Sequence, residues 1–340
     1  MKKRLIAILQ YTVFLGGGIF LVWWQLKDMT AIEKEEFTNA FHRANYWLII
    51  PVIGMSLLSH LLRSIRWKYL MEPLGYNPKL KNVFSVVMIG YLANSAIPRL
   101  GEILRCTFLA RYEKLNVGKL VGTIILERTF DFICFIIFIG ITILIQINTI
   151  GNYVKEKLIK IGNTEGIPIW VNGLIIFAII ILVVISIKFL FTKFPENKII
   201  SKINLFLKGI AQGFKTIKFL NKKKQFLVLT LLIWLLYLLQ VYIGFWAMEG
   251  TSHLSIKAAC SVLTLASLAM IVTPGGIGSF PLFVMQTLLI YNIAGPLGKA
   301  FGWLIWGVST GIVIIVGLSC LLIIPYLNRK KDEINQQYTG

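Results

Sequence analysis

Several uncharged stretches of this 340-residue chain exceed the ~20 residues that cross the hydrocarbon core of a bilayer. Hydrophobic residues make up 56% of the chain and charged residues only 15%, against roughly 25% charged residues in a soluble domain. A single water-soluble core cannot bury that much apolar side chain. The sequence therefore predicts an all-α polytopic membrane protein, and it excludes the soluble enzyme classes.

Six stretches are long enough to be full membrane spans, and two further apolar stretches are interrupted. The first span follows MKKR and has no small-residue cleavage site behind it, which predicts an uncleaved signal anchor. Residues 82–98 are short and end at Pro98, and residues 256–294 are broken by Pro274 and several glycines. We expect both interrupted stretches to form re-entrant helical hairpins. The six predicted full spans are 5–26, 46–67, 120–147, 168–191, 226–248 and 299–325.

The chain is strongly basic, with 35 Lys plus Arg, 15 Asp plus Glu and a formal net charge of +20. In a soluble protein this charge would suggest nucleic acid, but membrane proteins concentrate positive residues in their cytoplasmic loops. With a cytoplasmic N-terminus, and each hairpin leaving on the side it entered, the predicted cytoplasmic segments hold 24 Lys or Arg and the outer segments hold 8. We expect a multi-pass protein of the cell membrane, both termini cytoplasmic, with anionic lipid headgroups and no nucleic acid as partners.

The segment 193–224 is the most basic part of the chain, with nine lysines and one acidic residue, Glu196. Its apolar residues recur at spacings of three and four, which predicts an amphipathic helix lying on the cytoplasmic leaflet. This segment either recruits anionic lipid or serves only as a basic linker that enforces the topology. Its apolar positions are Ile199, Ile203, Phe206, Ile210, Phe214 and Ile217.

The cysteines and histidines are scattered along the chain and have no spacing typical of a metal site or a disulfide framework. The cysteines are expected to behave as small buried hydrophobic residues. The sequence predicts no metal and no cofactor. These residues are Cys106, Cys134, Cys260, Cys320, His42, His60 and His253.

Residues 46–147 and 226–325 have the same layout within a single integral membrane domain, 1–340. The distances from first span to break are 52 and 48 residues, and those from break to last span end are 49 and 51 residues. The first span of the first block runs from the outside to the cytoplasm, whereas the first span of the second block runs from the cytoplasm to the outside. This opposite direction predicts an inverted-topology repeat. Non-helical backbone at membrane depth survives only inside protein or beside a watery cavity, and half-helix N-termini attract anions. This arrangement is typical of alternating access for a polar or anionic substrate.

Two weaker motifs contribute candidate binding residues. The sequence LLRSIRW places Arg63 and Arg66 three apart on one helical face, where they either bind substrate or act only as topogenic charges. The sequence VTPGGIGSFP places Gly275, Gly276 and Gly278 at the second break. These glycines either cradle a phosphate or only allow a tight turn.

The strongest motif, ANSAIPRLGEILR, lies at the first break and supplies Asn94, Arg99, Glu102 and Arg105. An arginine there can hold a phosphate or carboxylate bidentately. Glu102 and Arg105 are three residues apart, so we expect them to pair on one turn. These two residues either close the hairpin as a structural clamp only, or form a clamp that is also part of a phosphate site.

The motif LERTFD places Glu127, Arg128 and Asp131 deep in the predicted span 120–147. Glu127 and Asp131 share one helical face. A charge at mid-bilayer costs at least ~2.5–3.5 kcal/mol on insertion scales, so these residues must face the protein interior and be paired. Their net charge is −1, and we expect Arg99 or Arg105 to complete the network.

Together the motifs RSIRW, NSAIPRLGEILR, ERTFD and PGGIG resemble the flippase-like membrane region of lysylphosphatidylglycerol synthases, over residues 5–325. The resemblance implies a membrane domain that moves an aminoacylated or otherwise modified lipid between leaflets. Only about 15 residues follow the last predicted span, so it implies a standalone member without the soluble aminoacyl-transferase domain and with a separate lipid-modifying enzyme as partner. The chain departs from the family pattern at Phe280, Pro281, Trp303 and Trp306, where acidic and arginine residues are common.

The leading hypothesis is a translocase for an anionic or modified phospholipid, or a related lipid-linked substrate, that is not driven by ATP because the chain has no P-loop motif. In this hypothesis Arg99, Arg105 and Arg128 contact the phosphate. An intramembrane aminoacyl or glycosyl transferase is the alternative, with Glu127 and Asp131 as its carboxylate pair. A structural membrane partner is the third reading.

Overall fold

The computed structural model describes residues 16–27, 29–161 and 220–337, and every regular element among these residues is a helix. The chain forms two compact units, Met1–Thr142 with Leu220–Gly340, and Ile143–Phe219. The candidate site and all contacts discussed below lie in the first unit. The predicted span 168–191 and residues 193–219 of the predicted basic linker lie outside the described residues.

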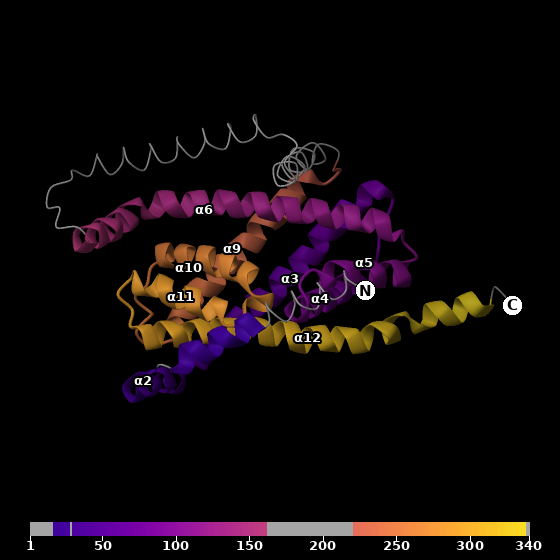
Figure 1. The fold of residues 1–340 in the computed structure, drawn as a ribbon. Helices are drawn as coiled ribbons and strands as arrows, with labels where there is room; N and C mark the ends of the chain where they lie inside the picture. Colours follow the sequence, from indigo (N-terminus) through magenta and orange to yellow (C-terminus); the bar gives the residue numbers. More distant parts are fainter. Residues whose placement is uncertain (1–15, 28, 162–219, 338–340) are drawn as a thin grey trace, which may run out of the picture. The chain divides into compact units, whose positions relative to one another are not determined.

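Residues 16–27 are helical, and a capping box of Thr30 and Glu33 starts the next helix. The elements then follow in the order α2 (Ala31–His42), η1 (Tyr46–Leu48), α3 (Ile49–Met71), η2 (Glu72–Leu74), α4 (Leu80–Ala96), α5 (Leu100–Glu113), α6 (Val117–Ile161), α9 (Lys223–Ala247), α10 (Ile256–Val272), η3 (Pro274–Gly276), α11 (Ser279–Leu289) and α12 (Gly295–Gln337) (Figure 1).

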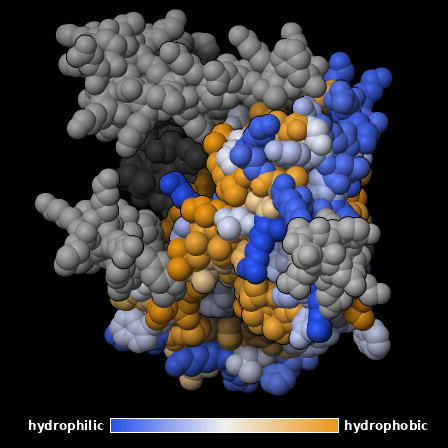
Figure 2. All heavy atoms as spheres, turned by 90° about the vertical axis from the view of Figure 1, so that its right-hand side faces the viewer, coloured by the Kyte–Doolittle hydropathy of each residue, from blue (hydrophilic) through white to orange (hydrophobic). Residues whose placement is uncertain are grey.

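Four helical segments of the described chain are long and apolar enough to cross a membrane, which confirms the membrane character of the chain. They coincide with four predicted spans, although each helix extends a few residues or more beyond the predicted limits. Many of their large apolar side chains face outward, Leu231 and Leu322 being 68% and 69% exposed. Figure 2 shows apolar side chains over much of one face, interrupted by hydrophilic groups. The four segments are Tyr46–Leu74, Val117–Ile147, Lys223–Ala247 and Gly295–Arg329.

Both interrupted stretches form pairs of short helices. Helix α4 ends two residues before Pro98 and α10 ends two residues before Pro274, because the residue before a proline is disfavoured in the helical conformation. Each of these helices has 17 residues and is therefore about 25 Å long, shorter than the ~30 Å hydrocarbon core. The partners α5 and α11 have 14 and 11 residues, so no arm of either hairpin is long enough for an untilted span.

The same order of helices occurs twice in the described chain, as α3, α4, α5, α6 and as α9, α10, α11, α12. The corresponding helices have 23, 17, 14 and 45 residues in the first set and 25, 17, 11 and 43 residues in the second. This is the layout that the sequence spacing predicts for 46–147 and 226–325. The inverted orientation in a bilayer, the re-entrant character of the hairpins and the total of six spans stay predictions.

Glycines bring the helices of the first hairpin and the two breaks into close contact. A Cβ atom at Gly101 on α5 would collide with the carbonyl oxygen of Gly90 on α4, so the two helices touch backbone to backbone. A Cβ atom at Gly275 would lie 3.4 Å from the Cα atom of Ser95. The tip of the second hairpin therefore rests against the tip of the first. Helix α12 packs along both hairpins, against α4 and α11 (Figure 1).

Candidate functional site

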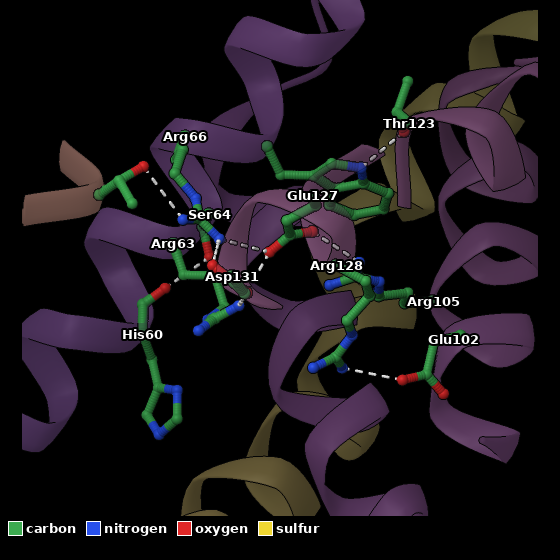
Figure 3. Close-up of polar contacts among 12 residues, drawn as sticks. His60, Arg63, Ser64, Arg66, Glu102, Arg105, Thr123, Glu127, Arg128 and Asp131 are labelled. Atoms are coloured by element: carbon green, nitrogen blue, oxygen red, sulfur yellow. Dashed lines mark hydrogen bonds and ion pairs between the residues drawn. The ribbon is translucent and has the colours of Figure 1, made fainter. Parts of the chain in front are cut away.

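The centre of the candidate site is a pair of carboxylates on α6 that faces two arginines on α3 (Figure 3). Glu127 and Asp131 are one helical turn apart, which puts both carboxylates on the same side of α6. Arg63 Nη1 lies 2.6 Å from Asp131 Oδ2 and 3.0 Å from Glu127 Oε1. Arg66 Nη2 lies 2.7 Å from Asp131 Oδ1 and 3.2 Å from Glu127 Oε1. The arginines of the RSIRW motif are thus buried ion-pair partners, beyond any topogenic role.

The first hairpin joins this cluster through Arg105 on α5. Arg105 Nη2 lies 2.6 Å from Glu127 Oε2, and its guanidinium lies 4.6 Å from the centre of the Trp67 ring. Of the two arginines expected to complete the network, Arg105 therefore does so. Arg99 stays outside the cluster: its side chain is exposed, and it has no hydrogen-bond or ion-pair partner among the residues that the structure describes.

A second ion pair joins the hairpin to α6 nearer the hairpin tip. Arg128 Nη2 donates to Glu102 Oε1 at 2.8 Å, and Asn94 Nδ2 donates to the same oxygen at 3.3 Å. The Asn94 Oδ1 atom accepts from the backbone N–H of Gly101 at 2.8 Å and so caps the start of α5. The expected pairing of Glu102 with Arg105 on one turn is wrong, because each of these residues reaches an opposite charge on α6 instead.

Helix α9 contributes neutral partners that the sequence analysis missed. Tyr237 Oη accepts from Arg63 at 3.1 Å, and Thr230 Oγ1 accepts from Arg66 at 3.1 Å. These two residues are two helical turns apart on a helix that is otherwise rich in leucine. The spacing of these two polar residues in an apolar span was the sequence signal that could have revealed them. Residues seven positions apart lie on the same side of a helix, so both can face the same partner helix.

The cluster lies near the middle of apolar helices and carries an excess of positive charge. Asp131 is the fifteenth residue of the 31-residue span Val117–Ile147. Arg63, Arg66 and Arg105 outnumber Glu127 and Asp131 by one, and the pair of Glu102 and Arg128 adds no net charge. Within the described part of the chain, several buried polar atoms in and beside the cluster have no hydrogen-bond partner: Arg63 Nε, Arg66 Nε, Arg105 Nε, Glu102 Oε2 and His60 Nδ1. The cluster can therefore accept a further anionic or polar group.

The backbone at both breaks adopts left-handed conformations. Arg99 has φ of 68°, which is uncommon for a non-glycine residue. Gly275, Gly276 and Gly278 have φ of 59°, 71° and 71°, so glycine is needed there for conformational reasons alone. Their nearest neighbours include Ser95, Met270, Phe280 and Gly18 rather than the charged cluster. The structure thus brings the glycines to the tip of the first hairpin, but not into the ion-pair network.

Among the described residues, no group of three His, Cys, Asp or Glu side chains is placed to hold a metal ion. The cluster itself offers guanidinium donors, carboxylate acceptors and aromatic rings. Guanidinium groups bind phosphate and carboxylate in a forked geometry that a single ammonium cannot offer. The arrangement favours binding of an anionic group.

Comparisons with known proteins show the family to which the chain belongs. The sequence profile of the lysylphosphatidylglycerol synthase TM region matches residues 6–329. A UPF0104 membrane protein of Methanocaldococcus jannaschii is 23% identical over 91% of this chain and 94% of its own length. One from Pyrococcus horikoshii is 26% identical over 82% of this chain and 84% of its own length. No solved structure matches the chain. This chain therefore belongs to the family of the lysylphosphatidylglycerol synthase transmembrane region.

Proposed function

We propose that this protein moves an anionic or aminoacylated phospholipid, or a related lipid-linked substrate, between the two leaflets of the cell membrane. The observation that carries the proposal is the exposure of the Glu102–Arg128 ion pair. Arg128 is 44% exposed and Glu102 is 26% exposed, although Arg128 is the twelfth residue of a 31-residue apolar span. Charged groups at that depth face a protein interior or a watery cavity, because exposure to hydrocarbon is too costly.

The residues around this pair fit a path for a charged headgroup. Arg99 at the hairpin tip is exposed and has no partner among the described residues, and the buried cluster holds an excess positive charge. Backbone strain at a non-glycine residue such as Arg99 persists where the surroundings impose it, often at ligand sites. A phosphate that approaches the exposed side of the Glu102–Arg128 pair would meet Arg128, whose side chain is 44% exposed, before Arg105, whose side chain is 4% exposed.

The contacts of the carboxylates fit an electrostatic role better than acid–base catalysis. Glu127 accepts from Arg63, Arg66 and Arg105, and Asp131 pairs with Arg63 and Arg66. Both oxygens of each carboxylate already face a guanidinium, so neither is poised to take a proton from a substrate. The geometry therefore favours the translocase over the transferase alternative.

The proposal includes the topology inferred from the sequence. In this topology the two sets of four helices form an inverted repeat, the hairpins enter from opposite faces of the membrane, and both termini are cytoplasmic. The contact between Gly275 and Ser95 supports a meeting of the two hairpin tips at mid-membrane. Inverted repeats of this kind place their substrate sites where discontinuous helices meet.

The test is lipid movement in proteoliposomes that contain the purified protein. Acyl-labelled fluorescent phosphatidylglycerol, its lysyl ester and phosphatidylcholine are followed by dithionite quenching of the outer leaflet, with and without an imposed ion gradient. Wild-type protein is expected to move at least one of the first two lipids faster than empty liposomes. Arg99→Gln is expected to slow that movement about tenfold or more, because hydrogen bonds to charged groups contribute about 1.5–3 kcal/mol.

Lys114→Gln is the matched control. Lys114 ends the same helix α5, is exposed and also has a positive φ, of 56°, so this change removes one charge from the same hairpin at its other end. Its transport rate is expected to equal that of the wild type. The proposal fails if wild-type protein moves none of the lipids faster than empty liposomes, or if correctly folded Arg99→Gln protein keeps the wild-type rate.

A further inference from the structure

Helix 16–27 covers one side of the second break. A Cβ atom at Gly278 would lie 2.6 Å from the carbonyl oxygen of Gly18 and 2.9 Å from Leu21 Cβ. A Cβ atom at Gly18 would lie 3.0 Å from the carbonyl oxygen of Ile277. The backbones of the helix and the break therefore touch, and glycine at both positions permits this contact.

A glutamine near the end of helix 16–27 bonds the helix to the break. Gln25 Nε2 donates to the carbonyl oxygen of Gly278 at 2.8 Å, and Gln25 is 4% exposed. It is the one residue of this helix before Lys27 whose side chain carries an amide, a hydroxyl or a charge. At the same end of the helix, Lys299 Nζ on α12 donates to the backbone carbonyl oxygen of Gln25 at 2.8 Å. The polar contacts of the helix thus lie near its C-terminal end.

The covering helix satisfies a group that the second repeat does not satisfy with its own side chains. Non-helical backbone at membrane depth survives only inside protein or beside a watery cavity. Thr273 Oγ1 donates to the carbonyl oxygen of Ile277 at 2.9 Å, and Trp306 Nε1 on α12 donates to that of Gly275 at 2.8 Å. The carbonyl oxygen of Gly278 instead receives its side-chain donor from the covering helix. On this side, the helix is what separates the break from lipid.

The contact that holds helix 16–27 on the break is narrow. Gly18 and Gln25 are the buried residues of the helix, whereas Ile19, Phe20 and Trp23 are 57%, 56% and 52% exposed. Gln25 Oε1 is buried and has no hydrogen-bond partner in the described part of the chain, so the contact satisfies the amide only in part. No hydrophobic driving force holds two helices together in a bilayer, because lipid replaces the lost contacts. Separation is therefore opposed mainly by glycine packing and two hydrogen bonds.

We propose that helix 16–27 is a lateral gate, which closes the second break toward the surrounding lipid and separates from Gly278 when a substrate lipid enters. This inference rests on the proposed function and adds the route of entry, from the bilayer past Gly278 to the junction of the two breaks, where Gly275 packs against Ser95. Because Lys299 bonds the helix near its C-terminal end, we expect a larger separation at Gly18.

The test locks the gate with a reversible disulfide. Gly18→Cys and Ile277→Cys are combined in protein whose native cysteines have been changed to alanine. A Cβ atom at Gly18 would lie 3.4 Å from Ile277 Cβ, close to the ~3.5–4.5 Å range of disulfides. Movement of short-chain fluorescent lipids is followed by extraction to albumin, because dithionite would also reduce the disulfide. The oxidised protein is expected to move lipid at least about tenfold more slowly than the wild type, and dithiothreitol should restore the rate.

Leu288→Cys combined with Gly298→Cys is the matched control. A Cβ atom at Gly298 would lie 3.6 Å from Leu288 Cβ, so this disulfide joins α11 to α12 and leaves helix 16–27 unlinked. The two helices already touch, since a Cβ atom at Gly302 would lie 2.7 Å from Pro281 Cα. The oxidised control is therefore expected to move lipid at the rate of its reduced form.

Spin labels measure gate opening without any transport. Nitroxides are attached at Phe20→Cys on the gate and Ile315→Cys on α12, which are 56% and 68% exposed, and their distance distribution is measured in lipid nanodiscs. Gln25→Leu removes the hydrogen bond to the break, so it is expected to raise the population with the longer distance about two- to tenfold, the range for one hydrogen bond. Gln240→Leu is the control, because Gln240 donates to the carbonyl oxygen of Leu236 within its own helix, and it should leave the distances unchanged.

The inference is overturned if the oxidised Gly18→Cys, Ile277→Cys protein moves lipid at the rate of its reduced form, or if Gln25→Leu leaves the label distances unchanged. The label measurement decides the question alone if the reduced double variant is unfolded or inactive. Lipid movement that depends on Arg99 and persists in the locked protein overturns only the gate. Gate opening in protein that moves no lipid overturns the translocase and leaves the gate in place.

Discussion

Arg105 on α5 and Glu127 on α6 form a 2.6 Å ion pair that is buried at both ends, with 4% and 0% of the side chains exposed. This pair connects the first hairpin to the arginines of α3, because Glu127 also accepts from Arg63 and Arg66. The hairpin is therefore held at its position by the same carboxylate that neutralises the centre of the cluster. Movement of the hairpin would require a new counter-charge for Arg105, and an anionic headgroup would supply one.

Removal of the Glu127 charge is expected to destabilise the protein strongly. Glu127→Gln leaves three buried arginines with one carboxylate, and breaking a buried pair in this way costs about 3–5 kcal/mol. The thermal unfolding temperature in detergent should fall clearly below that of the wild type. Glu249→Gln is the control, because Glu249 pairs with Arg43 at 4.0 Å and both side chains are at least 70% exposed. Equal unfolding temperatures for the two variants would contradict the importance of the cluster.

Gly101→Ala is expected to separate the two helices of the first hairpin. The added methyl group would collide with the carbonyl oxygen of Gly90 and lie 2.7 Å from Asn94 Cγ. Both atoms belong to the closely packed interior of the hairpin, so the backbone must shift and the unfolding temperature should fall. Gly122→Ala on α6 meets nothing within 4 Å and should be neutral or stabilising by about 0.5–1 kcal/mol. A Gly101→Ala protein as stable as Gly122→Ala would show that the helices are not in backbone contact.

The buried side chains of Asn82 and Asn328 are expected to be energetically coupled. Each amide donates to the other at 3.0 Å, which ties the start of α4 to the far end of α12. Asn328→Leu should cost about 1–3 kcal/mol, because it leaves polar atoms of Asn82 without their partner. Measured unfolding free energies for both single leucine variants and the double variant give the coupling. Additive effects in this cycle would mean that the amide pair contributes nothing.

The helices and the breaks could be predicted from the sequence because they depend on local properties. Long apolar runs predict spans, and Pro98 and Pro274 each follow the end of a 17-residue helix. The burial of Glu127 and Asp131 could also be predicted, since unpaired charges at that depth are too costly. The helix ends were less predictable, because charged residues such as Lys223 continue a helix beyond its apolar core.

The partners of the charged residues could not be predicted with the same success. Arg63 meets Tyr237, 174 residues away, and no local pattern reports such a contact. Glu102 and Arg105 were expected to pair because only their spacing was visible, yet each pairs with α6. The amide pair of Asn82 and Asn328 escaped notice because neither residue carries a charge or a motif. Tertiary packing decided which of several available partners each side chain reached.

The most direct test of the central claim is whether water reaches the face of α6 around Arg128 at membrane depth. Ile125 is 61% exposed and lies one turn before Arg128, whereas Ile137 on the same helix is 56% exposed and lies at a similar distance from the other end of the span. Each is replaced by cysteine in protein whose four native cysteines have been changed to alanine. The rate of reaction with a charged, membrane-impermeant thiol reagent is then measured in proteoliposomes. We expect Ile125→Cys to react much faster than Ile137→Cys, and equal slow reaction of both variants would contradict a polar path along this face.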